Sequence, residues 1–343
     1  DAKIYYIKVT QTNPNYEAEP ENAVFTISPK SIGANNIVLS GDNFSVEDNS
    51  FVYNGLNQKP TITVTDPDRG DNGTVLDKDI DYTVTIKNTD NTIMNDGGVN
   101  VGEYTVTITG MGNYNETVNR TFSISAKEIA TEDITVTLAT TSYTFDGTEH
   151  KPEVSSVTIS DVTDPIEYED AVYSNNVNAA LATATENAPT VTVSLKGNYS
   201  GTGVATFTIE QADLSDYVVT GLTTPTAYTG SPITPTFSVK ATETAETSLT
   251  ANTDYSVKYQ QAGADVDEMK DAGDYKILIT GEGNYKGSLD ADFTIERAQL
   301  NLTINLEGWA YGDTPNEPSL EGNLGEGDIT WEYKAAGAEA YSA

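Results

Sequence analysis

The segment from Asp66 to Gly73 has the residue types and spacing that most invite a chemical interpretation. It reads Asp-Pro-Asp-Arg-Gly-Asp-Asn-Gly, with acids at its first, third and sixth positions, which are Asp66, Asp68 and Asp71. Ca²⁺ prefers such oxygen ligands, but the EF-hand order, with glycine at the sixth position and glutamate at the twelfth, is missing. We therefore predict no metal and no other cofactor. Asp66, Asp68 and Asp71 are the calcium candidates if one binds.

The same segment contains Arg69, Gly70 and Asp71, the tripeptide recognised by integrins. At a loop tip, Arg69 and Asp71 could project in opposite directions and bridge an anionic and a cationic pocket. The alternative is a tight turn at Gly70 and Gly73 whose charged neighbours are solvated. Three-residue matches often arise by chance. The tripeptide is therefore a candidate binding site, and the turn is the simpler interpretation.

Groups suited to catalysis are sparse. His150 is the only histidine and there is no cysteine, so a histidine-rich or thiolate metal site cannot form. We expect His150 to be exposed at a turn. Glycosidase chemistry needs two carboxylates about 5 to 10 Å apart in a cleft, and chance pairs are unavoidable among 52 Asp and Glu. No pair recurs throughout the repeats described next, so we predict no catalytic residues and no enzyme activity.

An Asn-Tyr pair followed by a Phe-x-Ile strand occurs four times. The four Asn-Tyr pairs are Asn15-Tyr16, Asn113-Tyr114, Asn198-Tyr199 and Asn284-Tyr285, and the strands end at Ile27, Ile124, Ile209 and Ile295. Intervals of roughly 85 to 98 residues fit one small β domain each and are too long for a solenoid coil. We expect Tyr114, Tyr199 and Tyr285 to be buried structural residues rather than a carbohydrate platform, because they recur at one register.

A second pattern, which we call the box, is an aromatic residue, one residue and glycine, with proline five residues later. The boxes begin at Tyr53, Phe145 and Tyr228, and a looser copy begins at Tyr311. Glycine supplies the positive φ of a turn, and proline suits a strand start or edge. The box therefore predicts an early turn in each domain.

Period-two alternation before each Asn-Tyr pair predicts a half-buried strand, as in Tyr104, Val106 and Ile108. A glycine-bearing turn then leads into the Phe-x-Ile strand, so each unit closes with a β-hairpin. Apolar patterns of helical period are short. We predict an all-β fold, a tandem array of Ig-like β-sandwich modules forming an elongated rod.

The repeats set the expected domain boundaries. Only about four residues separate consecutive modules, which limits bending between them. We expect the closing half of a truncated module over 1–32, Ig-like modules over 33–126, 127–211 and 212–297, and the opening half of a truncated module over 298–343.

The amino-acid composition limits the kinds of partner that this chain can bind. The 18 Lys and Arg against 52 Asp and Glu give a net charge of −34. This excludes nucleic acid as a general partner, because neutralising phosphates requires a basic face. There is no apolar run long enough to insert into a membrane.

The box, Gly-x-Tyr-x-Val-x-Ile at 102–108 with a related strand at 273–279, the Asn-Tyr pairs and Phe-Thr-Ile together resemble the MBG and YDG kinds of tandem bacterial Ig-like surface repeat. The resemblance covers nearly the whole chain, although Ala180-Leu181 replaces the usual Gly-Thr in the second module. It implies an extracellular or cell-surface location and a role as stalk, spacer or adhesive domain, with no catalytic residues.

We therefore expect a non-catalytic extracellular stalk that presents another domain away from a bacterial cell. The alternative is an adhesin that binds a host protein or glycan through module loops. The halves at 1–32 and 298–343 would each expose apolar faces, so we also expect head-to-tail self-association.

Overall fold

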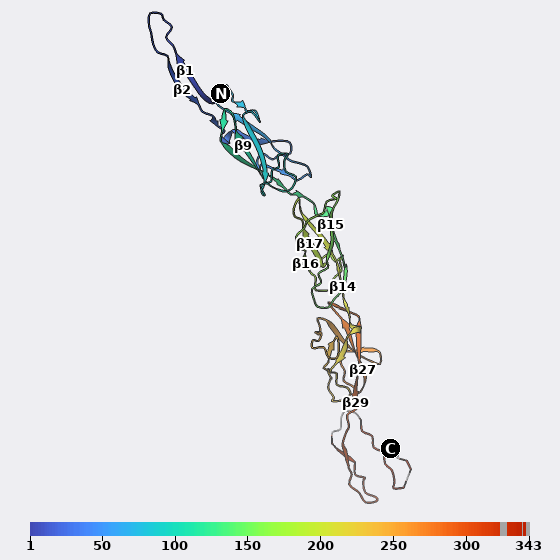
Figure 1. Cartoon of the computed structure of the whole chain (residues 1–343). Coiled ribbons are helices and arrows are strands. Elements are labelled where there is room, and N and C mark those ends of the chain that lie inside the picture. Colours follow the sequence, from blue (N-terminus) through green and yellow to red (C-terminus); the bar gives the residue numbers. More distant parts are fainter. Residues whose placement is uncertain (323–327, 338, 341–343) are drawn as a thin grey trace. The chain divides into compact units, whose positions relative to one another are not determined.

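The computed structural model describes residues 1–322, 328–337 and 339–340 (Figure 1). In this part of the chain, helical geometry is limited to three short 3-10 turns, η1 (Ala34–Asn36), η2 (Thr131–Asp133) and η3 (Leu214–Asp216). The all-β prediction is confirmed, because runs of alternating Thr, Val, Ile and Tyr suit a half-buried pleated surface.

Residue contacts divide the chain into two compact units. The first comprises Asp1–Thr141, Lys151–Asn176 and Ala188–Phe207, and the second comprises Ser142–His150, Val177–Asn187 and Thr208–Ala343. The second repeat therefore contributes residues to both units.

The first unit begins with an isolated hairpin of β1 (Lys3–Val9) and β2 (Glu21–Ile27). Tyr5 lies opposite Phe25, and their rings stack with centroids 5.1 Å apart. The apolar residues of this hairpin remain largely exposed, since no second sheet of the described chain covers them.

Two sheets enclose the core of the first repeat. One has the order β5-β11-β9-β8, the other has the order β4-β6-β7, and a short parallel pair β3·β10 lies beside them. The strands are β3 (Lys30–Ser31), β4 (Ile37–Ser40), β5 (Ser50–Val52), β6 (Thr61–Asp66), β7 (Thr74–Val75), β8 (Tyr82–Asn88), β9 (Gly102–Gly110), β10 (Tyr114–Asn115) and β11 (Thr117–Ser125). Their inward residues, among them Val64, Ile86, Val106 and Phe122, form one buried cluster.

The part of the second repeat that belongs to the first unit has a similar arrangement of strands. Its sheets there are β13·β15, β16-β17-β19 and the parallel pair β12·β18. The strands are β12 (Lys127–Glu128), β13 (Ile134–Leu138), β15 (Val154–Ile159), β16 (Val172–Ser174), β17 (Thr190–Ser194), β18 (Tyr199–Ser200) and β19 (Thr202–Thr206). Ile134, Val157 and Val193 are buried in its core.

The second unit holds a five-stranded sheet of order β23-β29-β27-β25-β26 and the two-stranded sheets β14·β20, β21·β28, β22·β24 and β30·β31. The strands are β14 (Ser142–Thr144), β20 (Thr208–Glu210), β21 (Ala212–Asp213), β22 (Val218–Thr220), β23 (Thr226–Ala227), β24 (Ser238–Lys240), β25 (Tyr255–Gln261), β26 (Ala264–Val266), β27 (Gly273–Gly281), β28 (Tyr285–Lys286), β29 (Ser288–Glu296), β30 (Leu302–Asn305) and β31 (Ser319–Gly322). Val239, Ile277 and Phe293 lie in its core.

The predicted closing hairpin is present in every repeat, as the antiparallel pairs β9·β11, β17·β19 and β27·β29. The phenylalanine of each Phe-x-Ile strand is at most 2% exposed: Phe122, Phe207 and Phe293. A short strand ahead of each box aromatic runs parallel to the end of that strand, in β5·β11, β14·β20 and β23·β29. The chain is thus an all-β tandem array of Ig-like β-sandwich modules.

Candidate functional site

The asparagine of the Asn-Tyr pair binds the backbone of the repeat before it. The Asn198 Oδ1 atom accepts a hydrogen bond from the Val101 N–H at 2.9 Å, and Asn198 Nδ2 donates to Asn100 Oδ1 at 3.0 Å. Val101 directly precedes β9 in the first repeat, and Asn198 directly precedes β18 in the second. One side chain therefore joins two repeats through a donor and an acceptor.

The same contact occurs at the other two Asn-Tyr pairs that follow a repeat or hairpin. Asn284 Oδ1 accepts from Ala179 N–H at 2.8 Å, and Asn284 Nδ2 donates to Asn178 Oδ1 at 3.2 Å. Asn113 Oδ1 accepts from Ala2 N–H at 2.8 Å, and its Nδ2 lies 3.3 Å from Asp1 Oδ1. We call this arrangement of Asn113, Asn198 or Asn284 on the preceding backbone the junction clamp.

Each clamp asparagine is also bound to the start of its own repeat. The Asn198 carbonyl accepts from Lys127 N–H at 3.1 Å, and the Asn284 carbonyl accepts from Ala212 N–H at 3.0 Å. These bonds begin the parallel pairs β12·β18 and β21·β28. The asparagine is therefore fixed on both sides, which limits the number of orientations that its side chain can sample.

The tyrosine after the asparagine packs on the box aromatic of the preceding repeat. Tyr199 meets Tyr53 edge to face at 5.4 Å, and Tyr285 meets Phe145 edge to face at 5.5 Å. Such pairs contribute about 0.5–1.5 kcal/mol beyond their buried area. The two repeated sequence patterns thus form one interface, with the box supplying one ring and the Asn-Tyr pair the other.

The box turn has the backbone that the sequence predicts. Gly55, Gly147 and Gly230 have φ values of +79°, +79° and +80°, a region that residues with a Cβ atom adopt at a cost. Each junction therefore uses an aromatic residue that stands two positions before a glycine of positive φ.

Burial changes the chemistry of the junction tyrosines. Burial raises the pKa of Tyr285, with a further contribution from the Tyr217 hydroxyl, and burial also raises the pKa of Tyr199. Tyr114 and Tyr285 are 6% and 8% exposed, as expected of structural residues, whereas Tyr199 is only partly buried.

The predicted calcium candidates lie where β6 turns into β7. Asp66 is buried, and its carboxylate forms an ion pair with the Lys30 ammonium group and accepts from the Tyr114 hydroxyl at 3.0 Å. Lys30 Nζ also lies 2.8 Å from Asp68 Oδ2. The bond from Lys30 is the main reason that the pKa of Asp66 is lowered. An ammonium ion thus occupies the space between these two carboxylates.

The third calcium candidate, Asp71, is not part of the ion pairs that Lys30 makes with Asp66 and Asp68. No group of three acidic, histidine or cysteine side chains is arranged to hold a metal ion in the described part of the chain. Gly70 and Gly73 have φ values of +80° and +78°, so the predicted tight turn is confirmed. The Arg69 carbonyl accepts from Thr74 Oγ1 at 2.7 Å, and the side chain of Asp71 is exposed at the turn. The tripeptide Arg69, Gly70 and Asp71 is therefore accessible.

The expectation that His150 is exposed is wrong. Its ring stacks on Tyr143 with centroids 4.6 Å apart, it lies 3.5 Å from the Asp146 carboxylate, and the residue is only 9% exposed. The polar residues next to His150 in sequence suggested exposure, but the residue that covers its ring is Tyr143 in β14, outside the turn.

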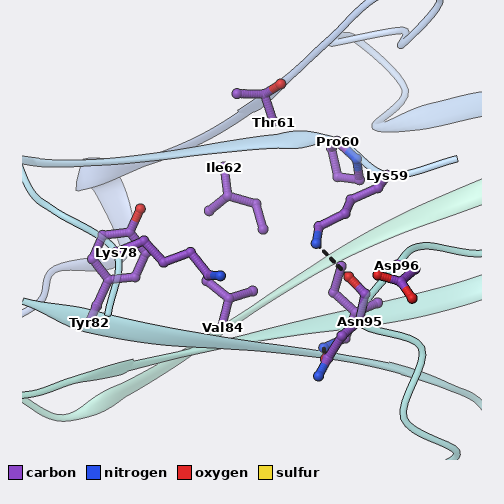
Figure 2. Close-up of a pocket in the computed structure, with 10 residues that line it drawn as sticks. Lys59, Pro60, Thr61, Ile62, Lys78, Tyr82, Val84, Asn95 and Asp96 are labelled. Carbon is purple, nitrogen blue, oxygen red and sulfur yellow. Dashed lines mark hydrogen bonds between the residues drawn. The ribbon is translucent and has the colours of Figure 1, made fainter. Parts of the chain in front are cut away.

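The first repeat also has an open hollow of about 470 Å³ between β6 and β8 (Figure 2). Ile62 and Val84 lie on opposite sides of it, and the Lys59 and Lys78 side chains extend into it. Lys59 Nζ donates to the Asn95 carbonyl, and Lys78 pairs with Asp79 at 3.4 Å. Asp96 is the single carboxylate in its lining, whereas glycosidase chemistry requires two.

Among the described residues, no helix has the length and apolar character needed to cross a membrane. No protein-family model matches the chain, and no curated protein matches it either.

Solved structures of extracellular tandem domains are similar to this chain at low identity. "Sidekick-1 immunoglobulin domains 1-5" is 10% identical, with 87% of this chain and 67% of that chain covered and a TM-score of 0.26. "Protocadherin Gamma B2 extracellular cadherin domains 1-5" is 12% identical over 93% and 72%, with a TM-score of 0.18. A structure described as "Ca2+-stabilized adhesin helps an Antarctic bacterium reach out and bind ice" is 13% identical over 80% and 77%, with a TM-score of 0.19.

Proposed function

We propose that this chain is a non-catalytic stalk of a bacterial surface or secreted protein, built from MBG/YDG-like modules over 33–126, 127–211 and 212–297, which holds another domain away from the cell. The observation that carries the proposal is the junction clamp. The same asparagine contacts recur at Asn113, Asn198 and Asn284, and a spacer needs each junction to hold one geometry.

The clamp combines three contributions at each junction between complete repeats. These are a short covalent connection, two asparagine hydrogen bonds and one edge-to-face ring contact. Each hydrogen bond contributes about 0.5–1.5 kcal/mol net. Together they exceed thermal energy several-fold, so a junction resists bending without a metal ion or a disulfide.

Surface charge supports an extracellular, solvated role. A net charge of −34 keeps a long array soluble and separates neighbouring copies. So acidic a composition does not suit binding to nucleic-acid phosphates, and in the part of the chain that the structure describes no helix is long and apolar enough to cross a membrane.

A second candidate function is adhesion to a host protein through the 66–73 turn. The favouring observation is that Asp71 and Arg69 are exposed at a turn with positive φ at Gly70. Binding to an immobilised integrin that is lost on Asp71→Ala, and kept on Asp42→Ala at another exposed site, would favour adhesion. A glycan screen tests the other ligand class, and turnover of polysaccharide would instead indicate an enzyme.

Small-angle scattering tests the stalk directly. Sandwiches joined end to end add about 35 to 40 Å each, because strands of up to ten residues rise 3.3 Å per residue. A maximum dimension above about 100 Å for three modules is expected. A compact particle of globular dimensions would contradict the proposal.

A further inference from the structure

The hollow between β6 and β8 in the first repeat brings together two of the few cationic side chains in this protein. Lys59 and Lys78 enter it from opposite sides, with their ammonium groups directed towards each other (Figure 2). The sequence has only 18 Lys and Arg against 52 Asp and Glu, and Asp96 is the single carboxylate in the lining. The hollow is therefore positive in an otherwise acidic protein, and its charge is complementary to an anion.

Both ammonium groups have hydrogen-bond donors left for a ligand. Lys59 Nζ donates to the Asn95 carbonyl, and within the described part of the chain it makes no ion pair. Lys78 Nζ lies 3.4 Å from the Asp79 carboxylate, which is longer than a charge-assisted hydrogen bond. A lysine ammonium group has three donors, and these contacts use at most one on each side chain. The remaining donors are available to a carboxylate.

The edge of β8 adds a backbone donor and a backbone acceptor. The Tyr82 carbonyl accepts from Asp79 N–H at 2.7 Å, on the side of β8 that faces away from β9. The Ile86 carbonyl accepts from Met94 N–H at 2.8 Å on the same side. Backbone groups alternate sides along an antiparallel strand, so those of Val84 also face away from β9. The Val84 N–H and C=O have no partner among the residues that the structure describes, and Val84 lines the hollow.

This edge suits a compact ligand and not an added strand. The Ile86 N–H donates to Asn95 Oδ1 at 3.1 Å, and the carbonyl groups of Tyr82 and Ile86 are also in use, so Val84 alone has both groups open. Strand addition relies on a series of main-chain bonds, which a single open residue does not provide. The hollow encloses about 470 Å³, within the range of about 300–1,000 Å³ found for small-molecule sites.

The remaining lining groups match hydroxyl groups and an apolar ring face. The Asp96 carboxylate and the Val84 carbonyl are hydrogen-bond acceptors. The Ile62 and Val84 side chains lie on opposite sides of the hollow and provide apolar surface (Figure 2). A ring that carries hydroxyl groups and one carboxylate would use the cations, the acceptors and the apolar walls together.

We propose that this hollow binds an acidic sugar residue, a pyranose ring that carries one carboxylate. The carboxylate lies between the Lys59 and Lys78 ammonium groups. The ring packs between Ile62 and Val84, and its hydroxyl groups donate to the Asp96 carboxylate. The site uses no residue of the junction clamp or of the 66–73 turn, so the inference goes beyond the stalk function and does not depend on it.

The third repeat has the same framework without the two cations. Lys59 corresponds to Thr234, and Lys78 corresponds to Ala251. The alignment follows from matching isolated bridges, Gln58 with Gly98 and Ile233 with Met269, then Lys78 with Tyr82 and Ala251 with Tyr255. The fold therefore does not require a lysine at either position, and the pair distinguishes the first repeat from the third.

The first test is a titration of the whole chain, labelled with ¹⁵N, with D-glucuronate and with D-glucose, which has a hydroxymethyl group in place of the carboxylate. Saturable shifts of the Val84 amide resonance are expected with glucuronate. Binding should be at least about tenfold tighter than that of glucose, because ammonium–carboxylate bonds are charge-assisted. Acetate, a carboxylate without the ring, should also bind at least about tenfold more weakly. No saturable glucuronate binding, or equal binding of glucose or acetate, would overturn the proposal.

Charge-removing variants test the two lysines. Lys59→Gln and Lys78→Gln should each weaken glucuronate binding at least about tenfold. Lys127→Gln is the matched control, because Lys127 is exposed outside the hollow and its replacement changes the net charge equally. Lys59 and Lys78 are themselves exposed, so unfolding in urea should be unchanged. Equal effects of all three variants would show a general charge effect and would overturn the proposal.

A filling variant tests the hollow without removing a charge. Phe237 occupies the position of Ile62 in the third repeat, so Ile62→Phe should fit the framework and exclude the sugar. The alignment follows from matching backbone bonds, Leu76 N–H to the Val64 carbonyl and Leu249 N–H to the Val239 carbonyl. Val38→Phe, at an exposed position of β4, should leave binding unchanged. Unaltered binding in Ile62→Phe would place the ligand elsewhere and overturn the proposal, whereas the stalk function, tested by scattering, would still stand.

Discussion

The Asn198 side chain accepts a hydrogen bond from the Val101 backbone at 2.9 Å, although the two residues are 97 positions apart in sequence. The bond joins the Asn-Tyr pair of one repeat to the start of β9 in the repeat before it. Asn284 and Ala179 make the same bond at 2.8 Å. A sequence pattern that looks internal to each repeat is therefore the connection between repeats.

The ring contact between Tyr53 and Tyr199 should carry a measurable share of the junction energy. Replacing either with Ala, and then both, gives a double-mutant cycle from urea unfolding of the whole chain. We expect a coupling free energy of about 0.5–1.5 kcal/mol. The pair Tyr53 and Tyr173, which lies on different repeats without a ring contact, serves as the control. A coupling free energy equal to that of the control pair would show that the ring contact does not stabilise the junction.

Phe207 should be among the most costly core residues to truncate. It is fully buried in the second repeat, so Phe207→Ala should lower the free energy of unfolding by about 3 to 5 kcal/mol. The adjacent Thr206→Ala is the control, since Thr206 is exposed. A loss below about 1 kcal/mol at Phe207 is a surface value and would contradict its place in the core.

Asp66 should make stability depend on acidic pH. The ion pair with Lys30 and the bond from Tyr114 lower the folded-state pKa of Asp66. The stabilisation is therefore fully present above the unfolded pKa of about 3.9 and is lost as the pH falls through the lower folded value. Urea unfolding at pH 2 to 6 should show a smaller loss of stability towards low pH in Asp66→Asn than in the unsubstituted chain. Identical slopes would show that Asp66 is not paired.

Calcium should change stability very little. The Lys30 ammonium group already pairs with both Asp66 and Asp68, so a cation there would first have to displace it. We expect 1 mM Ca²⁺ to shift the melting temperature by less than about 1 °C, since ligand that does not bind the folded state adds no stability. Magnesium at the same ionic strength is the control. A selective rise with calcium, abolished by Asp66→Asn, would instead establish a calcium site.

Local patterns predicted much of the fold. The alternation at Tyr104, Val106 and Ile108 correctly predicted strand β9, and the glycine of the box correctly predicted the positive φ at Gly55. Both features depend only on residues that are neighbours in sequence. The turn at Gly70 and Gly73 followed from the same local chemistry.

The functional contacts could not be predicted in this way. Asn198 meets Val101, and Lys30 meets Asp66, only after distant strands come together. His150 was expected to be exposed because its neighbours in sequence are polar, yet Tyr143 covers one face of its ring. The signal that was available for the clamp was the presence of asparagine before the tyrosine in every repeat.

The clamp should hold the junction between repeats in one geometry. Spin labels at Thr121→Cys and Thr158→Cys, exposed sites on β11 and β15, report the distance distribution across the first complete junction by pulsed electron paramagnetic resonance. One narrow distribution is expected, which Asn198→Ala should broaden and Asn72→Ala, at an exposed asparagine outside the clamp, should leave unchanged. A broad distribution in the unsubstituted chain, or one that Asn198→Ala leaves unchanged, would contradict it.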